Sequence, residues 1–357
     1  MINVTKTYLP DFEKYTTLIK KIYATGWVTN NGALVRELEE NLKKYLDVKH
    51  LFFCSNGTIT LQIALKALNI TKEIITTPFS YVATLNAILW ENCTPIFADI
   101  NAKDFCIDAT QIENLITPNT QAILATHVYG LPCNIEAIDA ISKKYNIPII
   151  YDAAHAFGTL YNNQSLLSYG DIASCSFHAT KVFHSIEGGC LITNNDALAN
   201  KIYLMRQFGH INDDYFIAGI NAKNSELHAA MGICVLNDLE KIIHKRTVLT
   251  TLYSNILKNT SLQILQYPIS IKPNYGYYPV VFKNEPQLLQ VRKKLEGKGI
   301  YTRRYFHPSL NTLPFVHNLQ HCPVSEDLAS RVLCLPLFYE LTENEVYMIC
   351  NSIIEAL

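Results

Sequence analysis

The organisation of this 357-residue chain is set by the stretch Ser174-Cys-Ser-Phe-His-Ala-Thr-Lys-Val-Phe-His-Ser-Ile-Glu-Gly-Gly-Cys190. Residues 172–177 form an apolar run that leads into small and polar residues around Lys181, and Gly188-Gly189 then opens a second apolar run at 190–193. Short apolar runs of this kind are typical of buried strands. The pattern therefore predicts that Lys181 lies on a turn between two buried strands.

A lysine at such a turn has two interpretations, a solvated surface residue or a reactive amine. Burying an ammonium group is unfavourable unless the group is paired or loses its proton, and a deprotonated amine is a nucleophile. The residues upstream favour the second interpretation, because the apolar run 147–151 ends in Asp152 and His155 follows. An aspartate at the carboxyl end of a buried strand is placed to meet a cation.

Pyridoxal phosphate needs both of these groups. Its ring acts as an electron sink only while the pyridine nitrogen stays protonated, which an aspartate partner ensures, and its aldehyde forms a Schiff base with a lysine. A strand-end Asp152 followed by Lys181 therefore predicts a pyridoxal phosphate enzyme. In this interpretation Lys181 is the catalytic residue and Asp152 binds the cofactor.

Composition limits the other possibilities. The chain is 49% hydrophobic with a formal net charge of −1 and no run of like charge, so neither nucleic acid nor an anionic membrane surface is indicated as a partner. The N-terminal residues lack an apolar leader and no stretch is long enough for a membrane span, so we expect a soluble cytoplasmic protein. The 10 cysteines lack C-x-x-C spacing, which favours reduced core residues and no metal site.

The pattern of elements predicts an α/β fold. Helices are expected at 12–25 and in the segment that ends near 46, where Glu37, Glu39 and Glu40 would face outward. Near-continuous apolar runs follow, which predict a seven-stranded, mostly parallel sheet covered on both faces. These runs are 51–54, 74–77, 95–98, 122–126, 147–151, 172–177 and 190–193.

A smaller domain is expected after this sheet. Helices at 196–208 and 225–258 are followed by strand-like runs at 278–282 and 301–306, which indicate a small α+β domain. We therefore expect a large domain at 12–240 and a small C-terminal domain at 241–357, with residues 1–11 packed on it.

Two strand-to-helix junctions could hold further parts of the cofactor. Ser55-Asn-Gly-Thr58 precedes a helix whose N-terminal amides could bind a phosphate, although a Ser or Thr N-cap also explains these residues. Ser176 would add a hydroxyl if the lysine turn folds back. At the second junction, one of Phe79 and Tyr81 could stack on a flat ring while the other packs in the core.

These residues belong to a larger set of ordered motifs. In chain order they are Gly26-Trp-Val-Thr-Asn-Asn-Gly32, Ser55-Asn-Gly-Thr58, Pro78-Phe-Ser-Tyr-Val-Ala-Thr84, Asp152-Ala-Ala-His-Ala-Phe-Gly158, Ser176-Phe-His-Ala-Thr-Lys181, Glu187-Gly-Gly189, Gly219-Ile-Asn221 and Leu333-Cys-Leu-Pro-Leu337. With this set, the chain resembles the DegT/DnrJ/StrS family of pyridoxal-phosphate-dependent sugar aminotransferases over essentially its whole length. The resemblance implies the aspartate aminotransferase fold, fold type I.

The resemblance also implies roles for individual residues. Lys181 would form the internal aldimine with the cofactor, which alternates with its pyridoxamine form, and Asp152 would pair with the pyridine nitrogen. His155 would bond the ring hydroxyl where many members carry Gln, which leaves its protonation state open. Tyr81 would stack on the ring. The implied phosphate ligands are Gly57, the amides of Thr58 and Ile59, the Ser176 hydroxyl, and Asn221 of a neighbouring subunit.

The shared phosphate site implies a homodimer with shared active sites. The implied substrates are L-glutamate and a nucleotide-linked keto-6-deoxyhexose for surface polysaccharides such as the lipopolysaccharide O-antigen. Two segments, 221–226 and 303–308, look most like enzymes that make dTDP-4-amino-4,6-dideoxy-D-glucose from dTDP-4-keto-6-deoxy-D-glucose. The candidates for gripping the sugar or pyrophosphate are Trp27, Thr29, Lys223, Arg303, Tyr305 and His307.

The sequence departs from the family at two places and leaves alternatives open. Lys223 stands where many members read Arg, and Tyr151 stands where an acidic residue commonly precedes the Asp. Amination at C3, the other epimer and a UDP-sugar remain possible products or substrates. A pyridoxal-phosphate-dependent sugar dehydratase would carry His in place of Lys181, an NAD-linked oxidoreductase would need G-x-G-x-x-G, and a non-enzymatic sensor would need no lysine.

Overall fold

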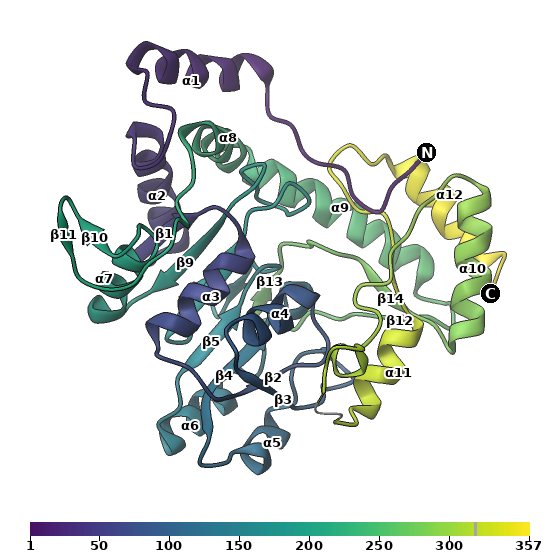
Figure 1. The fold of residues 1–357 in the computed structure, drawn as a ribbon. Coiled ribbons are helices and arrows are strands. Elements are labelled where there is room, and N and C mark those ends of the chain that lie inside the picture. The colour runs from purple at the N-terminus through teal and green to yellow at the C-terminus, as the bar shows by residue number, and fades with distance from the viewer. Residues whose placement is uncertain (318–319) are drawn as a thin grey trace.

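A seven-stranded sheet forms the centre of the computed structural model, which describes residues 1–317 and 320–357. The strand order is β1-β9-β8-β5-β4-β2-β3, and β9 pairs antiparallel with both β1 and β8 while the pairs among β2, β3, β4, β5 and β8 are parallel (Figure 1). Its strands are β1 His50–Cys54, β2 Glu73–Thr76, β3 Thr94–Phe97, β4 Thr120–Thr126, β5 Ile149–Asp152, β8 Ile172–Ser176 and β9 Gly189–Thr193. The predicted fold class is confirmed.

Both faces of this sheet are covered by helices. The helices are α1 Phe12–Thr25, α2 Ala33–Leu46, α3 Gly57–Ala67, α4 Val82–Trp90, α5 Ala109–Ile112, α6 Ile135–Tyr145, α7 Asp196–Met205, α8 Glu226–Asn237, α9 Leu239–Leu257, α10 Glu285–Gly297, α11 Pro323–Arg331 and α12 Glu343–Ile354. Successive strand residues enter different cores, as Ile149 packs with α2, α6 and α8 whereas Ile150 packs with α3, α4 and α7. A strand buried on both faces must be apolar throughout, which explains the near-continuous apolar runs.

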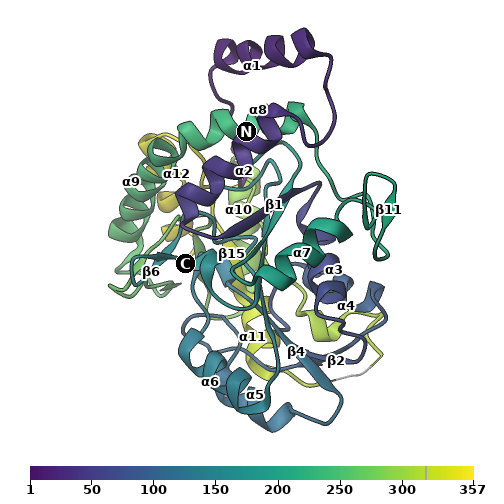
Figure 2. The ribbon, with the colours of Figure 1, turned by 90° about the vertical axis from the view of Figure 1, so that its left-hand side faces the viewer.

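The C-terminal part of the chain has a core of its own. Apolar residues of α9, α10 and α12 enclose a sheet of order β12-β14-β15, formed by Gln263–Ile264, Pro279–Val281 and Val332–Cys334. Ile2 joins this core and pairs with Ile300. Figure 2 shows α12 beside α9, and α12 also packs against α10. The predicted division of the chain near residue 240 remains a prediction.

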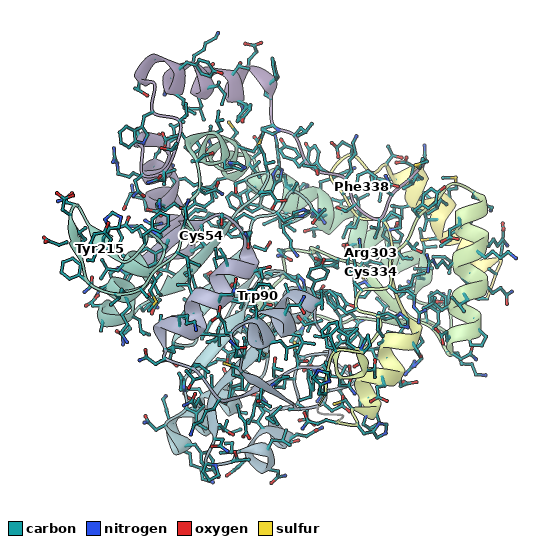
Figure 3. The ribbon with its side chains drawn as sticks, viewed as in Figure 1. Cys54, Trp90, Tyr215, Arg303, Cys334 and Phe338 are labelled. Atoms are coloured by element: carbon teal, nitrogen blue, oxygen red, sulfur yellow. The ribbon has the colours of Figure 1, made fainter. Side chains whose placement is uncertain are left out.

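The remaining strands form small additions at the edges. They are β6 Leu160–Tyr161, β7 Gln164–Ser165 and β13 Ile271–Lys272 in one sheet, and the hairpin β10 His210–Ile211 and β11 Asp214–Tyr215. Figure 3 shows Tyr215 at the end of this hairpin, away from the central sheet, where 77% of the residue is exposed.

Three expectations about the elements were wrong. The predicted helix at 225–258 is two helices, because α8 ends at Asn237 and α9 begins at Leu239. The run 301–306 forms no strand, and only Arg303 pairs with Cys334, which lies beside it in Figure 3. Glu39 points inward, because its carboxylate accepts a hydrogen bond from Phe53 N at 2.8 Å and pairs with the buried Arg206.

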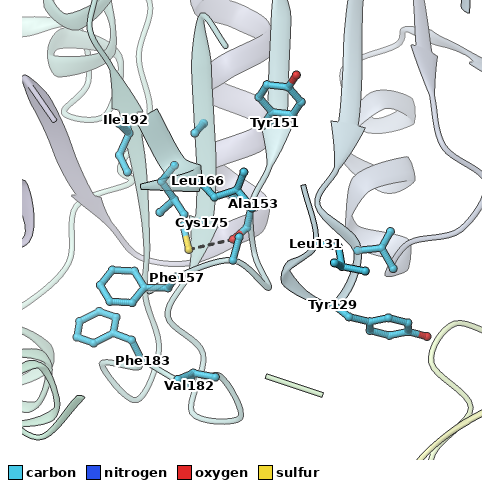
Figure 4. Close-up of a cluster of buried hydrophobic side chains, with 14 of the residues drawn as sticks. Tyr129, Leu131, Tyr151, Ala153, Phe157, Leu166, Cys175, Val182, Phe183 and Ile192 are labelled. Carbon is cyan, nitrogen blue, oxygen red and sulfur yellow. Dashed lines mark hydrogen bonds between the residues drawn. The ribbon is translucent and has the colours of Figure 1, made fainter. Parts of the chain in front are cut away.

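The cysteines lie in the interior as expected, since all 10 are buried and free. Cys175 donates a 3.3 Å hydrogen bond to the carbonyl of Ala153 within the core drawn in Figure 4, where Phe157 and Phe183 stack at 4.3 Å. Within 1–317 and 320–357, none of the helices combines the length and the apolar character needed to cross a membrane.

Candidate active site

A cavity of about 270 Å³ lies beyond the carboxyl ends of β1, β5 and β8, where ligands bind in open α/β sheets. It gathers residues that are far apart in the sequence. The predicted site residues that line it are Gly57, Thr58, Tyr81, Asp152, His155, Ser176, Lys181, Arg303 and Tyr305. The structure therefore brings the predicted lysine and aspartate together in one cavity.

Lys181 lies on the turn after β8, as predicted. Its backbone amide donates to the carbonyl of His178 at 2.9 Å, which closes the turn, and its side chain enters the cavity half-buried. The Nζ atom donates a 3.2 Å hydrogen bond to Tyr277 Oη. The amine is thus held by a hydroxyl of the cavity wall.

Asp152 is a buried acid at the end of β5, with 5% of its surface exposed. Its carboxylate accepts hydrogen bonds from Thr84 Oγ1 at 2.6 Å and from Ala154 N at 3.1 Å. Burial raises the pKa of Asp152, and these hydrogen bonds and the charge of Lys181 oppose that effect. A desolvated carboxylate that lines a cavity is stabilised by a cation placed there, so the residue fits a protonated pyridine nitrogen.

His155 is held neutral in the cavity wall. Burial lowers the pKa of His155 well below its usual value, and the nearby Lys181 charge lowers it further. The ring Nδ1 accepts the amide of Tyr129 at 3.3 Å, so the proton of the neutral ring lies on Nε2. Phe306 stacks on the ring at 5.3 Å and fixes its plane.

The N-terminus of α3 forms another wall of the cavity. A Cβ atom at Gly57 would lie 2.8 Å from the Cβ atom of Ser176, so only glycine lets the helix approach the lysine turn this closely. The amides of Thr58 and Ile59 donate to Asn56 Oδ1 at 3.0 and 2.9 Å, so an ordinary cap is present, but Asn56 supplies it and not the Ser or Thr that the sequence suggested. Gly57, Thr58 and the Ser176 hydroxyl face the cavity beside a positive helix terminus, which fits a phosphate.

The two aromatic residues near position 80 separate into different environments. Phe79 is fully buried and packs edge-on against Tyr129 and Phe306. Tyr81 lines the cavity with 51% of its surface exposed, so its ring is the one available to a flat ligand.

Several predicted residues lie outside this cavity. They are Trp27, Thr29, Ile59, Asn221, Lys223 and His307. Trp27 is 56% exposed and lines a different cavity, beside α1 and α2. Lys223 lies over the ring of Phe208 at 4.5 Å, and Asn221 is an exposed residue that pairs with Gln207. A single chain therefore does not place these side chains at Lys181.

Three residues of the site were not predicted from the sequence. Thr84 orients Asp152 through a hydrogen bond, and Phe306 stacks on His155. Tyr277 accepts a hydrogen bond from the amine of Lys181. Thr84 belongs to a motif that the sequence singled out, but nothing in the sequence relates it to Asp152. Within the described parts of the chain, no group of His, Cys, Asp and Glu side chains has an arrangement that could hold a metal ion.

Comparison with known proteins agrees with this geometry. The model of the DegT/DnrJ/EryC1/StrS aminotransferase family matches residues 11–354. Two proteins described as dTDP-4-amino-4,6-dideoxy-D-glucose transaminase, from Escherichia coli and Shigella dysenteriae, are 36% and 37% identical, each over 99% of this chain and 98% of the relative. The crystal structure of DesI in the presence of its TDP-sugar product is 28% identical, with a TM-score of 0.94 over 99% of this chain and 93% of that chain.

Proposed function

Because this chain belongs to the DegT/DnrJ/EryC1/StrS aminotransferase family, we propose that it transfers the amino group of L-glutamate to C4 of dTDP-4-keto-6-deoxy-D-glucose. The chain is a nucleotide-sugar aminotransferase, and its family implies pyridoxal phosphate as the cofactor. The product of the proposed reaction is dTDP-4-amino-4,6-dideoxy-D-glucose. The observation that carries the proposal is that Lys181 and Asp152 line one cavity.

Each cavity residue has a task in this proposal. Bound pyridoxal phosphate supplies an electron sink for the charge that remains when a proton leaves the amino-bearing carbon. Lys181 would bond the cofactor and, once free, carry that proton at Nζ. Asp152 would hold the proton on the pyridine nitrogen. His155 would donate its Nε2 proton to the ring hydroxyl, because the ring is neutral and its Nδ1 is already occupied.

The remaining cavity residues would bind and orient. Gly57, Thr58 and Ser176 would hold the phosphate at the terminus of α3, and Tyr81 would lie against the ring face. Arg303 and Tyr305 would bind the pyrophosphate and the sugar. The guanidinium group of Arg303 lies 4.7 Å from the centre of the Tyr305 ring, and a guanidinium group can form paired hydrogen bonds with a phosphate.

We also propose that two copies of the chain share their active sites. The predicted ligands Trp27, Thr29 and Asn221 are exposed and lie away from their own cavity, as does half-buried Lys223. A second copy would bring such segments over the cavity of the first, which would complete the phosphate and sugar subsites.

The position of amination is tested with a panel of acceptors. The purified protein would be supplied with pyridoxal phosphate, L-glutamate and either a 4-keto or a 3-keto 6-deoxy dTDP-hexose, and the new amine located by NMR. We expect 2-oxoglutarate to form with the 4-keto sugar and the amine to appear at C4 in the gluco configuration. Amination of the 3-keto sugar alone would overturn the C4 assignment, and absence of 2-oxoglutarate with every acceptor would overturn the proposed activity.

A further inference from the structure

Tyr277 enters the cavity from a segment that lies well beyond the central sheet in the sequence. Its Oη atom accepts the hydrogen bond from Lys181 Nζ at 3.2 Å, and its ring lies 5.8 Å below the same atom. Among the described residues, no carboxylate forms a salt bridge with Lys181, and the Tyr277 hydroxyl is its hydrogen-bond acceptor. The hydroxyl of Tyr277 therefore fixes the position of the Lys181 amine.

The ring of Tyr277 is fixed by its neighbours. It packs edge-on against His155 at 5.0 Å and against Tyr305 at 5.6 Å, and it lies 5.5 Å from the ring of Tyr129. A phenol held on three sides keeps its hydroxyl in one place, which lowers the entropy lost when Lys181 binds to it.

The backbone before Tyr277 is tied to the segment that carries His155. Buried Asn274 donates to the carbonyls of His155 and Phe157, both at 2.8 Å, and accepts the amide of Gly276 at 2.9 Å. Arg246 is buried and donates to the carbonyls of Tyr275 and Gly276, both at 3.2 Å. These hydrogen bonds hold the backbone next to Tyr277 in a fixed position relative to the segment that carries His155.

We propose that Tyr277 is a positioning residue that receives the amine of Lys181 whenever that amine is free. This role rests on the proposed transamination, in which Lys181 is free from the point at which the amine of L-glutamate replaces it on the cofactor until release of the aminated sugar restores its bond to the cofactor. The hydroxyl stabilises the free amine and keeps it beside the carbon from which it takes the proton. Removing the hydroxyl should therefore disfavour every state with a free lysine relative to the state in which the lysine is bonded to the cofactor.

The test uses Tyr277→Phe, which retains the ring and its contacts. The visible band of the loaded protein would be titrated with mixtures of L-glutamate and 2-oxoglutarate to find the ratio at which half of the band is lost. We expect the variant to need about a tenfold higher ratio, the effect of one hydrogen bond to a charged group. In the cofactor-free protein, pyridoxal phosphate should bind to the variant at least as tightly as to the wild type. A purely structural role would instead weaken cofactor binding.

The matched control is Tyr278→Phe, which removes the neighbouring hydroxyl from its 3.0 Å contact with Ser254 and leaves Lys181 untouched. It should leave the glutamate to 2-oxoglutarate ratio at the wild-type value. An unchanged ratio for Tyr277→Phe, weaker cofactor binding or failure of the variant to fold would each overturn the role of Tyr277. A wild-type protein that develops no visible band with pyridoxal phosphate would overturn the proposed function itself, so the two failures are distinguishable.

Discussion

His155 is a buried base whose environment excludes its charged form. Its pKa in the folded state lies well below the usual value, because burial and then the charge of Lys181 disfavour the imidazolium. The unfolded chain therefore binds a proton that the folded chain does not bind once the pH falls below about 6.5, the usual pKa of histidine. His155 therefore does not lower the stability of the fold above that pH. Below that pH, the free energy of unfolding decreases as the pH decreases.

We expect His155→Gln to reduce the pH dependence of stability of the cofactor-free protein. Below about pH 6, its free energy of unfolding should fall less steeply than that of the wild type, by about 1.4 kcal/mol per pH unit. Urea unfolding at a series of pH values measures this slope. The control is His244→Gln, which replaces an exposed histidine of α9. Equal slopes for His155→Gln and the wild type would show that His155 is not held neutral.

Individual residues differ in how far the sequence could place them. Asp152 and Lys181 were predictable because each follows an apolar run whose end marks the binding edge of a parallel sheet. Tyr277 was not, because it is separated from Lys181 by 96 positions and its contact depends on bonds made by Asn274 and Arg246. A local pattern carries no information about such a distant pairing.

Helix α2 begins on an unusual cap that another helix supplies. Gly32 offers no side chain, and the buried carboxylate of Glu226 on α8 accepts the amides of Leu34 and Val35 at 2.9 and 2.8 Å. A Cβ atom at Gly32 would overlap the carboxyl group of Glu226, so any larger residue there would displace the capping carboxylate.

Truncation of this cap should destabilise the protein. We expect Glu226→Ala to lower the free energy of unfolding by about 2 kcal/mol, because two buried amides lose charged hydrogen bonds and a positive helix terminus loses its counter-charge. The control is Glu37→Ala on the exposed face of α2, which should change stability by less than about 0.5 kcal/mol. Urea unfolding compares the two, and equal stabilities would contradict the capping role.

Element boundaries were predictable where the chain signals them locally. Helix α1 begins after Asp11, which caps the amides of Glu13 and Lys14, and ends at Gly26 in the left-handed region, so both limits are visible in the sequence. The break between α8 and α9 falls at Asp238, where no glycine or proline interrupts the pattern. The inward position of Glu39 could not be predicted from the sequence either, because its partner Arg206 lies at the end of a helix that is distant in the sequence.

Active sites shared between two copies of the chain predict complementation between inactive variants. Lys181→Ala would remove the lysine from one copy, and Asn221→Ala would remove the proposed partner-derived phosphate ligand from the other. Random mixing would make about half of the dimers mixed, each with one intact site, and should restore about a quarter of wild-type activity.

This recovery would be measured after the two variants are unfolded and refolded together, with each variant refolded alone as a control. Sedimentation would establish whether dimers form. A dimeric mixture without recovered activity would contradict shared sites, as would a fully active monomer. The sequence could predict this arrangement only through its family resemblance, because the exposed positions of Trp27 and Asn221 become apparent in the folded chain.

We propose that Lys181 bonds the cofactor while Asp152 faces the cofactor in the same cavity. The most direct measurement is reduction of the loaded protein with sodium borohydride, followed by mass spectrometry of its peptides. We predict one pyridoxyl label per chain, on Lys181, and no label on that peptide in Lys181→Ala. A label on another lysine of the wild type, or no label on a protein that has bound pyridoxal phosphate, would show that Lys181 does not bond the cofactor.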